Sequence, residues 1–244
     1  MVRETVLTAA IAALVAALVL TILQIVWVTP LILQAEAYEQ PAAEPHEHAD
    51  DHAHEHAAGT SGAAHEHHHD GAEWKPRDGW QRTTFTLAAN LLLAFGYAMV
   101  LIAVYVLWRE PRNVVQGAIY GIGGFTVFFL APSLGLPPEL PGTAAAELIV
   151  RQSWWAMVAA ATAAGLLMLF SRANWKLRVS GLVLIVAPHF VAAPHPEVPG
   201  SLAPETLQAQ FRVASTLSNA IFWLLLGLIS AGAFRRMSQR RVPA

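Results

Sequence analysis

Long apolar runs alternate with shorter polar segments along the whole chain. A helix needs about 20 apolar residues to cross the hydrocarbon core of a bilayer. Runs of about that length lie at 7–29, 85–108, 113–131, 153–170, 178–193 and 213–234. The pattern therefore predicts six transmembrane helices. The fifth run is short and meets Pro188, so an interpretation with five helices stays open.

A repeated order of proline and arginine marks the ends of these runs. The first, third and fifth runs each end at a proline, and each returning run begins soon after an arginine; these residues are Pro30, Pro132, Pro188, Arg82, Arg151 and Arg212. We therefore expect an all-α integral membrane protein with six transmembrane helices, arranged as three hairpin repeats of parallel orientation. In this arrangement the prolines and arginines line an outer vestibule. The alternative is that the prolines only end helices and the arginines only snorkel to the interface.

The connection inside the first hairpin is unusually long and rich in histidine. From proline to arginine it covers 52 residues, against 19 and 24 in the other two hairpins. It holds nine of the eleven histidines, interspersed with Glu and Asp: His46, His48, His52, His54, His56, His65, His67, His68 and His69. Imidazole and carboxylate ligands suit Zn, Ni, Co and Cu(II). We expect residues 42–73 to form a disordered metal-binding loop, the alternative being an inert low-complexity linker.

Few other polar residues fall in or beside the apolar runs. His189 follows Pro188 at the end of the fifth run, and His195 and Glu197 follow in a proline-rich loop. Two imidazoles and one carboxylate could hold a divalent metal there, although a lone histidine at an interface is also common. Inside the runs, past their end residues, the amide side chains are Gln24, Asn90, Gln116 and Asn219. No carboxylate lies in the middle of any run, which weakens a self-sufficient proton-coupled mechanism.

Composition and charge define the protein class and the orientation. The chain is 55% hydrophobic and 13% charged, which leaves no room for a large soluble domain. Ten of the fifteen basic residues lie at the termini and after the second and fourth runs, while fifteen of the seventeen acids lie on the other side. The positive-inside rule then predicts cytoplasmic termini and an extracytoplasmic His-rich loop. The bilayer is the expected partner, and nucleic acid is not expected.

The helices and their connections divide the chain into seven segments. The first run is about 23 residues long, which favours an uncleaved anchor over a signal peptide. In chain order the segments are 1–41 with the first helix, the His-rich loop 42–73, 74–112 with the second helix, 113–152 with the third helix and a proline-rich loop, 153–177 with the fourth helix, 178–212 with the fifth helix and a second proline-rich loop, and 213–244 with the sixth helix and a basic tail.

Two glycines in the third run are expected to serve packing. Gly117 and Gly121 form a GxxxG pattern, which lets membrane helices approach closely.

Several strings together resemble one known family, the probable cobalt transporter family CbtA, over nearly the whole chain. They are WVTPL followed by QAEAYE, the His-rich stretch, DGWQRTTFTLAAN, LAPSLGLPPELPG, RQSWW, VAPHF with PHPEVPG, and NAIFWLLLG. The resemblance implies a multi-pass protein of the bacterial inner membrane that takes part in cobalt uptake for cobalamin synthesis. It also implies a small His-containing single-span protein as partner, and it carries over no catalytic residue.

Two functions follow from these observations. The first is a transporter subunit for a divalent cation, most simply Co²⁺, with Ni²⁺ or Zn²⁺ as other candidates and with no permanently bound cofactor. The second is a membrane-anchored metal receptor or chaperone that passes Ni, Zn or Co to a partner. An enzyme is not expected, because no constellation of nucleophile, base and oxyanion donor is visible.

Overall fold

The computed structural model describes residues 2–39, 76–171 and 174–239, which fold almost entirely as helices. No β-strand is found among them. In chain order the elements are α1 (Val2–Leu23), a π-helical turn (Gln24–Val28), α2 (Thr29–Glu39), α3 (Trp80–Leu107), α4 (Val114–Phe125), a second π-helical turn (Thr126–Leu130), α5 (Ala131–Ser133), α6 (Leu148–Leu169), α7 (Trp175–Val186), a 3₁₀ turn (Ala187–Phe190) and α8 (Glu205–Gln239). The predicted all-α class is confirmed for these ranges.

Five helical stretches in the described residues are long and apolar enough to cross a membrane. They are Arg3–Glu39, Trp80–Leu107, Val114–Ser133, Leu148–Leu169 and Glu205–Gln239. The fifth predicted run instead forms the 12-residue α7 and the four-residue 3₁₀ turn. Together these span about 26 Å, somewhat less than the ~30 Å hydrocarbon thickness. Helix length therefore supports five spans within the described residues, and the sixth predicted span is not confirmed.

Pro30 lies inside a continuous helix that runs on to Glu39, so the prediction that the first helix ends at it is wrong, whereas the helix that contains Pro132 ends one residue later, at Ser133. Each proline follows a five-residue π turn. At the ends of these turns, Thr29 N–H donates to the Gln24 carbonyl and Ala131 N–H donates to the Thr126 carbonyl. A proline normally clashes with the carbonyl four residues earlier, and a widened turn relieves that clash. At Pro188, in contrast, the α-helix gives way to the 3₁₀ turn.

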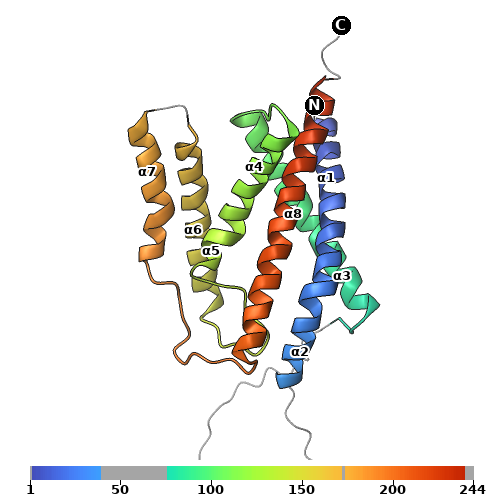
Figure 1. Cartoon of the computed structure of the whole chain (residues 1–244), viewed down its shortest axis with the longest axis vertical. Helices are drawn as coiled ribbons and strands as arrows, with labels where there is room; N and C mark the ends of the chain where they lie inside the picture. The colour runs from blue at the N-terminus through green and yellow to red at the C-terminus, as the bar shows by residue number, and fades with distance from the viewer. Residues whose placement is uncertain (1, 40–75, 172–173, 240–244) are drawn as a thin grey trace, which may run out of the picture.

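The helices form a four-helix bundle with a helix pair at its side (Figure 1). In the bundle, α1 packs against α3 and α8, and α4 packs against α8. A row of alanines on α1 makes the close contact possible, because none of them is more than 3% exposed: Ala9, Ala12, Ala13, Ala16 and Ala17. The helix pair consists of α6 and α7. Among the described residues α7 packs along α6 and not along α8, so the third expected hairpin is open.

Glycines set the closest helix contacts. A Cβ added to Gly117 would lie 2.4 Å from the carbonyl oxygen of Gly227, and one added to Gly227 would lie 2.2 Å from that of Gly117. Gly165 and Gly181 approach each other between α6 and α7 in the same way, at 2.6 Å. The packing role predicted for Gly117 is thus confirmed. Its partner on α8 could not be read from the GxxxG pattern.

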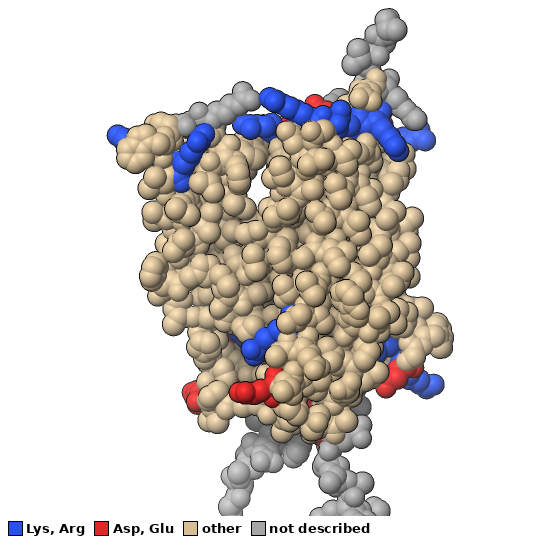
Figure 2. All heavy atoms as spheres, in the orientation of Figure 1, with Lys and Arg blue, Asp and Glu red and all other residues tan. Residues whose placement is uncertain are grey.

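Charged residues separate to the two ends of the molecule, with an uncharged belt between them (Figure 2). Most visible Lys and Arg side chains lie at the end that carries both termini, here called the basic end. Asp and Glu lie mainly at the opposite end, here called the acidic end, together with a few basic side chains. Because charged groups are costly in hydrocarbon, this belt is the part suited to the membrane interior.

Candidate functional site

Two of the predicted intramembrane amides meet in a cluster between α1 and α3. Asn90 is 7% exposed, and its Nδ2 donates to the Thr21 hydroxyl at 3.0 Å and to Gln24 Oε1 at 2.6 Å. Thr21 in turn donates to the Ala17 carbonyl at 2.8 Å. Gln24 opens the first π turn, so the widened turn and the polar cluster coincide. π turns of this kind often mark functional positions in helices.

Asn219, another of the predicted amides, does not join this cluster through a hydrogen bond. Its Nδ2 donates to the Ser215 carbonyl on its own helix at 3.0 Å. Ser218, next to it, is 1% exposed, and its hydroxyl has no hydrogen-bond partner among the described residues. These groups are neutral hydroxyls and amides, so they offer oxygen ligands or hydrogen bonds and no charge.

The two proline-rich loops are joined to each other at the acidic end. Both contain Pro-Gly followed by a hydroxyl residue, and these residues, Thr143 and Ser201, form an antiparallel bridge. Ala144 N–H donates to the Gly200 carbonyl at 2.9 Å, and Leu202 N–H donates to the Gly142 carbonyl at 3.1 Å. Gly142 has a φ of 74°, a backbone conformation that favours glycine. The two strings PPELPG and PHPEVPG, which both end in Pro-Gly, therefore contact each other through this bridge.

Two of the three repeated arginines bind carboxylates near this junction. Arg82 on α3 donates to both carboxylate oxygens of Glu36 on α2, and to Asp78 at 2.8 Å. Arg151 on α6 donates to Glu139 at 3.1 Å. Both pairs connect a proline-containing segment to the next helix, so each holds one end of a helical hairpin closed.

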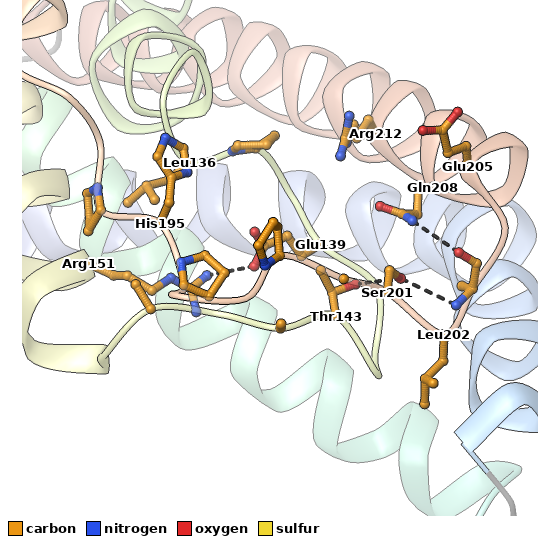
Figure 3. A pocket seen from close by; sticks show the side chains of 18 of the residues that line it. Leu136, Glu139, Thr143, Arg151, His195, Ser201, Leu202, Glu205, Gln208 and Arg212 are labelled. Atoms are coloured by element: carbon orange, nitrogen blue, oxygen red, sulfur yellow. Dashed lines mark hydrogen bonds and ion pairs between the residues drawn. The ribbon is translucent and has the colours of Figure 1, made fainter.

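A cavity of about 660 Å³ lies between the two loops and the beginning of α8 (Figure 3). This volume is typical of small-molecule sites. Its polar lining includes the Arg151–Glu139 pair, His195, Gln208 and Arg212. Gln208 is held in place by a hydrogen bond from its Nε2 to the Ala203 carbonyl, at 3.1 Å. The lining thus combines a fixed ion pair with a second guanidinium group.

The predicted metal ligands are not gathered into one site within the described part of the chain. The ring of His189 packs edge-on against the ring of Trp154, with centroids 6.4 Å apart. His195 is exposed and lines the cavity, and Glu197 is exposed but does not line it. No group of three or more His, Asp or Glu residues in the described ranges could hold a metal ion. The nine histidines from His46 to His69 lie outside these ranges.

Sequence reasoning identified the arginines of this site but not their partners. Glu36 and Glu139 were not singled out, although each lies six or seven residues after the proline of its own repeat. That spacing, compared across the first two repeats, is the signal that could have found them.

Membrane-length helices, an uncharged belt between ends of opposite charge and a polar cavity at one end together define a multi-pass integral membrane protein. The particular family follows from comparison with known proteins. The chain belongs to the CbtA family, because the family model described as "Probable cobalt transporter subunit (CbtA)" matches residues 2–235. No curated protein and no solved structure matches the chain significantly.

Proposed function

We propose that this protein is the membrane-embedded subunit of a cobalt uptake transporter in a bacterial inner membrane. The observation that carries the proposal is the family match over residues 2–235, which covers four of the five membrane-length helices of the described ranges completely and the fifth except for its last four residues. Co²⁺ is the substrate, and the protein's role is transport rather than catalysis. Cobalt taken up in this way would be available for cobalamin synthesis.

The proposed orientation places the basic end in the cytoplasm. Both termini lie at that end (Figure 1), and the positive-inside rule favours cytoplasmic Lys and Arg. The acidic end then faces outward, where its carboxylates attract cations. In this orientation α2 ends and α3 begins on the outer side. We therefore propose that the His-rich loop 42–73, which connects them in the sequence, is extracytoplasmic and collects metal through its imidazole and carboxylate groups.

A small single-span partner with its own histidines is the second part of this proposal. Members of this family are described as transporter subunits, which implies a second component. The buried polar residues of the described helices are Thr8, Thr21, Asn90, Thr162, Ser215, Ser218 and Ser230, and none of these carries a titrating group. Stripping water from a divalent cation is costly without charged or imidazole ligands. A partner that supplies such ligands would complete the path.

Reconstitution into liposomes tests the proposal directly. Uptake of radiolabelled cobalt is measured with this protein alone, with the partner alone and with both together. We expect uptake only when both proteins are present and the acidic end faces the labelled solution. Equal uptake by empty liposomes and by the complete pair would contradict a transport function.

A metal receptor that hands its ion to another transporter is the second candidate function. It is favoured by one observation, namely that no three-ligand metal group is found among the described residues. In that case the purified protein binds cobalt tightly but does not move it across liposomes with the partner. His189, His195 and Glu197 do not form one three-ligand site in the described ranges, so we propose them only as single ligands outside the His-rich loop, and alanine variants of the two histidines should lower cobalt binding.

A further inference from the structure

The three arginines that repeat along the chain differ in how many carboxylates they bind. Arg82 binds two, Glu36 and Asp78, and Arg151 binds one, Glu139. The guanidinium of Arg212 has no hydrogen bond or ion pair among the described residues; the Thr216 hydroxyl donates to its backbone carbonyl and not to its side chain. The third repeat therefore has an arginine at the same position as the other two, but among the described residues this arginine binds no carboxylate.

Arg212 lines the cavity at the acidic end, together with Arg151 (Figure 3). Glu205, which also lines the cavity, begins α8 seven residues before Arg212. Seven residues correspond to about 10 Å along a helix, and the two side chains form no ion pair. The other carboxylate of the lining, Glu139, is already held by Arg151. Within the described part of the chain, the cavity thus contains one guanidinium whose five donors have no partner.

We propose that this cavity binds a carboxylate ligand through Arg212, with Arg151 as a secondary contact. A guanidinium group presents its donors as a planar fork that matches the two oxygens of a carboxylate. The same chain uses this pairing at the equivalent positions of its first two repeats. Gln208 and the hydroxyls of Thr143 and Ser201 add neutral donors to the lining.

A bare divalent cation is a poor ligand for this cavity. Two guanidinium groups, Arg151 and Arg212, and two carboxylates, Glu139 and Glu205, line it, so the lining offers a cation no net charge attraction, and no group of three or more metal-ligating side chains is found in the described ranges. The inference goes beyond the proposed function, because carboxylate binding does not require transport. It also has a consequence for that function, since a metal ion chelated by carboxylates could be held at this cavity through its chelator.

Two sources could supply the carboxylate. One is a free polycarboxylate that chelates metal ions. The other is the chain itself, since residues 40–75 contain eight Asp and Glu residues. This segment follows Glu39 directly, and a Cβ on Gly142 would lie 3.2 Å from both Glu39 Cγ and Leu202 Cδ1. Leu202 lines the cavity, so the acidic segment begins beside the cavity rim.

Calorimetric titration of the purified full-length protein with citrate, in metal-free buffer of low ionic strength, tests the proposal. Arg212→Gln should weaken citrate binding about tenfold or more, because charge-assisted hydrogen bonds are lost. Arg178→Gln is the matched control, since Arg178 is an exposed arginine on α7 and does not line the cavity. It should leave the affinity unchanged. Glu139→Gln should tighten binding severalfold, because it frees Arg151 without removing a cation.

A variant in which all Asp and Glu of residues 44–73 are replaced by Asn and Gln distinguishes the two sources. Citrate affinity that rises severalfold in this variant identifies the chain's own segment as a competing occupant, whereas unchanged affinity identifies free carboxylates as the ligand. Either result supports the cavity as a carboxylate site. Absence of citrate binding in this variant, unchanged binding in Arg212→Gln, or weaker binding in Glu139→Gln would each overturn the proposal. Citrate binding by Glu139→Gln tests the proposal even if Arg212→Gln does not fold.

Discussion

Replacing Gly121 by alanine tests whether the contact between α4 and α8 holds the helix bundle together. A Cβ on Gly121 would lie 2.2 Å from the carbonyl oxygen of Trp223. An ordinary carbon–oxygen contact is about 3.3 Å, so the two backbones would have to separate by roughly 1 Å. Gly123 provides the matched control, because it lies on the same helix and a Cβ there meets nothing within 4 Å.

The expected magnitude follows from these distances. A radial gap of about 0.5–1 Å forfeits a quarter to a half of each dispersion contact across the interface, and overpacking of a tight contact typically costs about 1–3 kcal/mol. Both substitutions gain up to about 1 kcal/mol in helix propensity, because alanine replaces glycine. This gain cancels in the comparison. We therefore expect Gly121→Ala to be about 1–3 kcal/mol less stable than Gly123→Ala.

Unfolding of the two variants in mixed detergent micelles, titrated with sodium dodecyl sulfate and followed by circular dichroism, gives the difference in stability. Gly227→Ala should show a similar loss, because its Cβ would lie 2.2 Å from the Gly117 carbonyl oxygen on the other side of the same interface. The double variant Gly121→Ala/Gly227→Ala should lose less stability than the two single variants lose added together, since one separation of the helices relieves both clashes. Equal stability of Gly121→Ala and Gly123→Ala would refute the reasoning.

Three further predictions concern the polar cluster, the orientation and the His-rich loop. Asn90→Leu should lower the free energy of unfolding by about 1 kcal/mol in the same assay, because hydrogen bonds between two helices are lost. Asn219→Leu should lower it less, because Asn219 bonds only to its own helix. Equal losses would argue against the cluster. A reporter at the C-terminus should be active only in the cytoplasm and one inserted near Gly59 only outside the cell, and the reverse pattern would contradict the proposed orientation. Deletion of residues 42–72 should leave cobalt uptake intact at saturating metal and reduce it when metal is scarce; loss at every concentration in a stably inserted variant would show that the loop belongs to the transport path.

Features that depend on neighbouring residues were predictable from the sequence. The requirement of about 20 apolar residues for each crossing is met locally, so the membrane class and five of the spans could be read directly. The separation of basic and acidic ends follows from the same local order of charges. Family membership could also be inferred, because it rests on strings of adjacent residues. Helix ends were less accurate, since the first helix continues to Glu39, well past its apolar run.

The tertiary structure decided every feature that requires two distant segments to meet. The pairing of Asn90 with Gln24 joins residues 66 apart, and that of Arg82 with Glu36 joins residues 46 apart. The cavity exists only because the two proline-rich loops form a bridge over the beginning of α8. The packing of α7 on α6 depends on two glycines that let the backbones approach. Such contacts depend on which surfaces fit together in three dimensions, and a linear pattern of apolar and polar residues does not encode that fit.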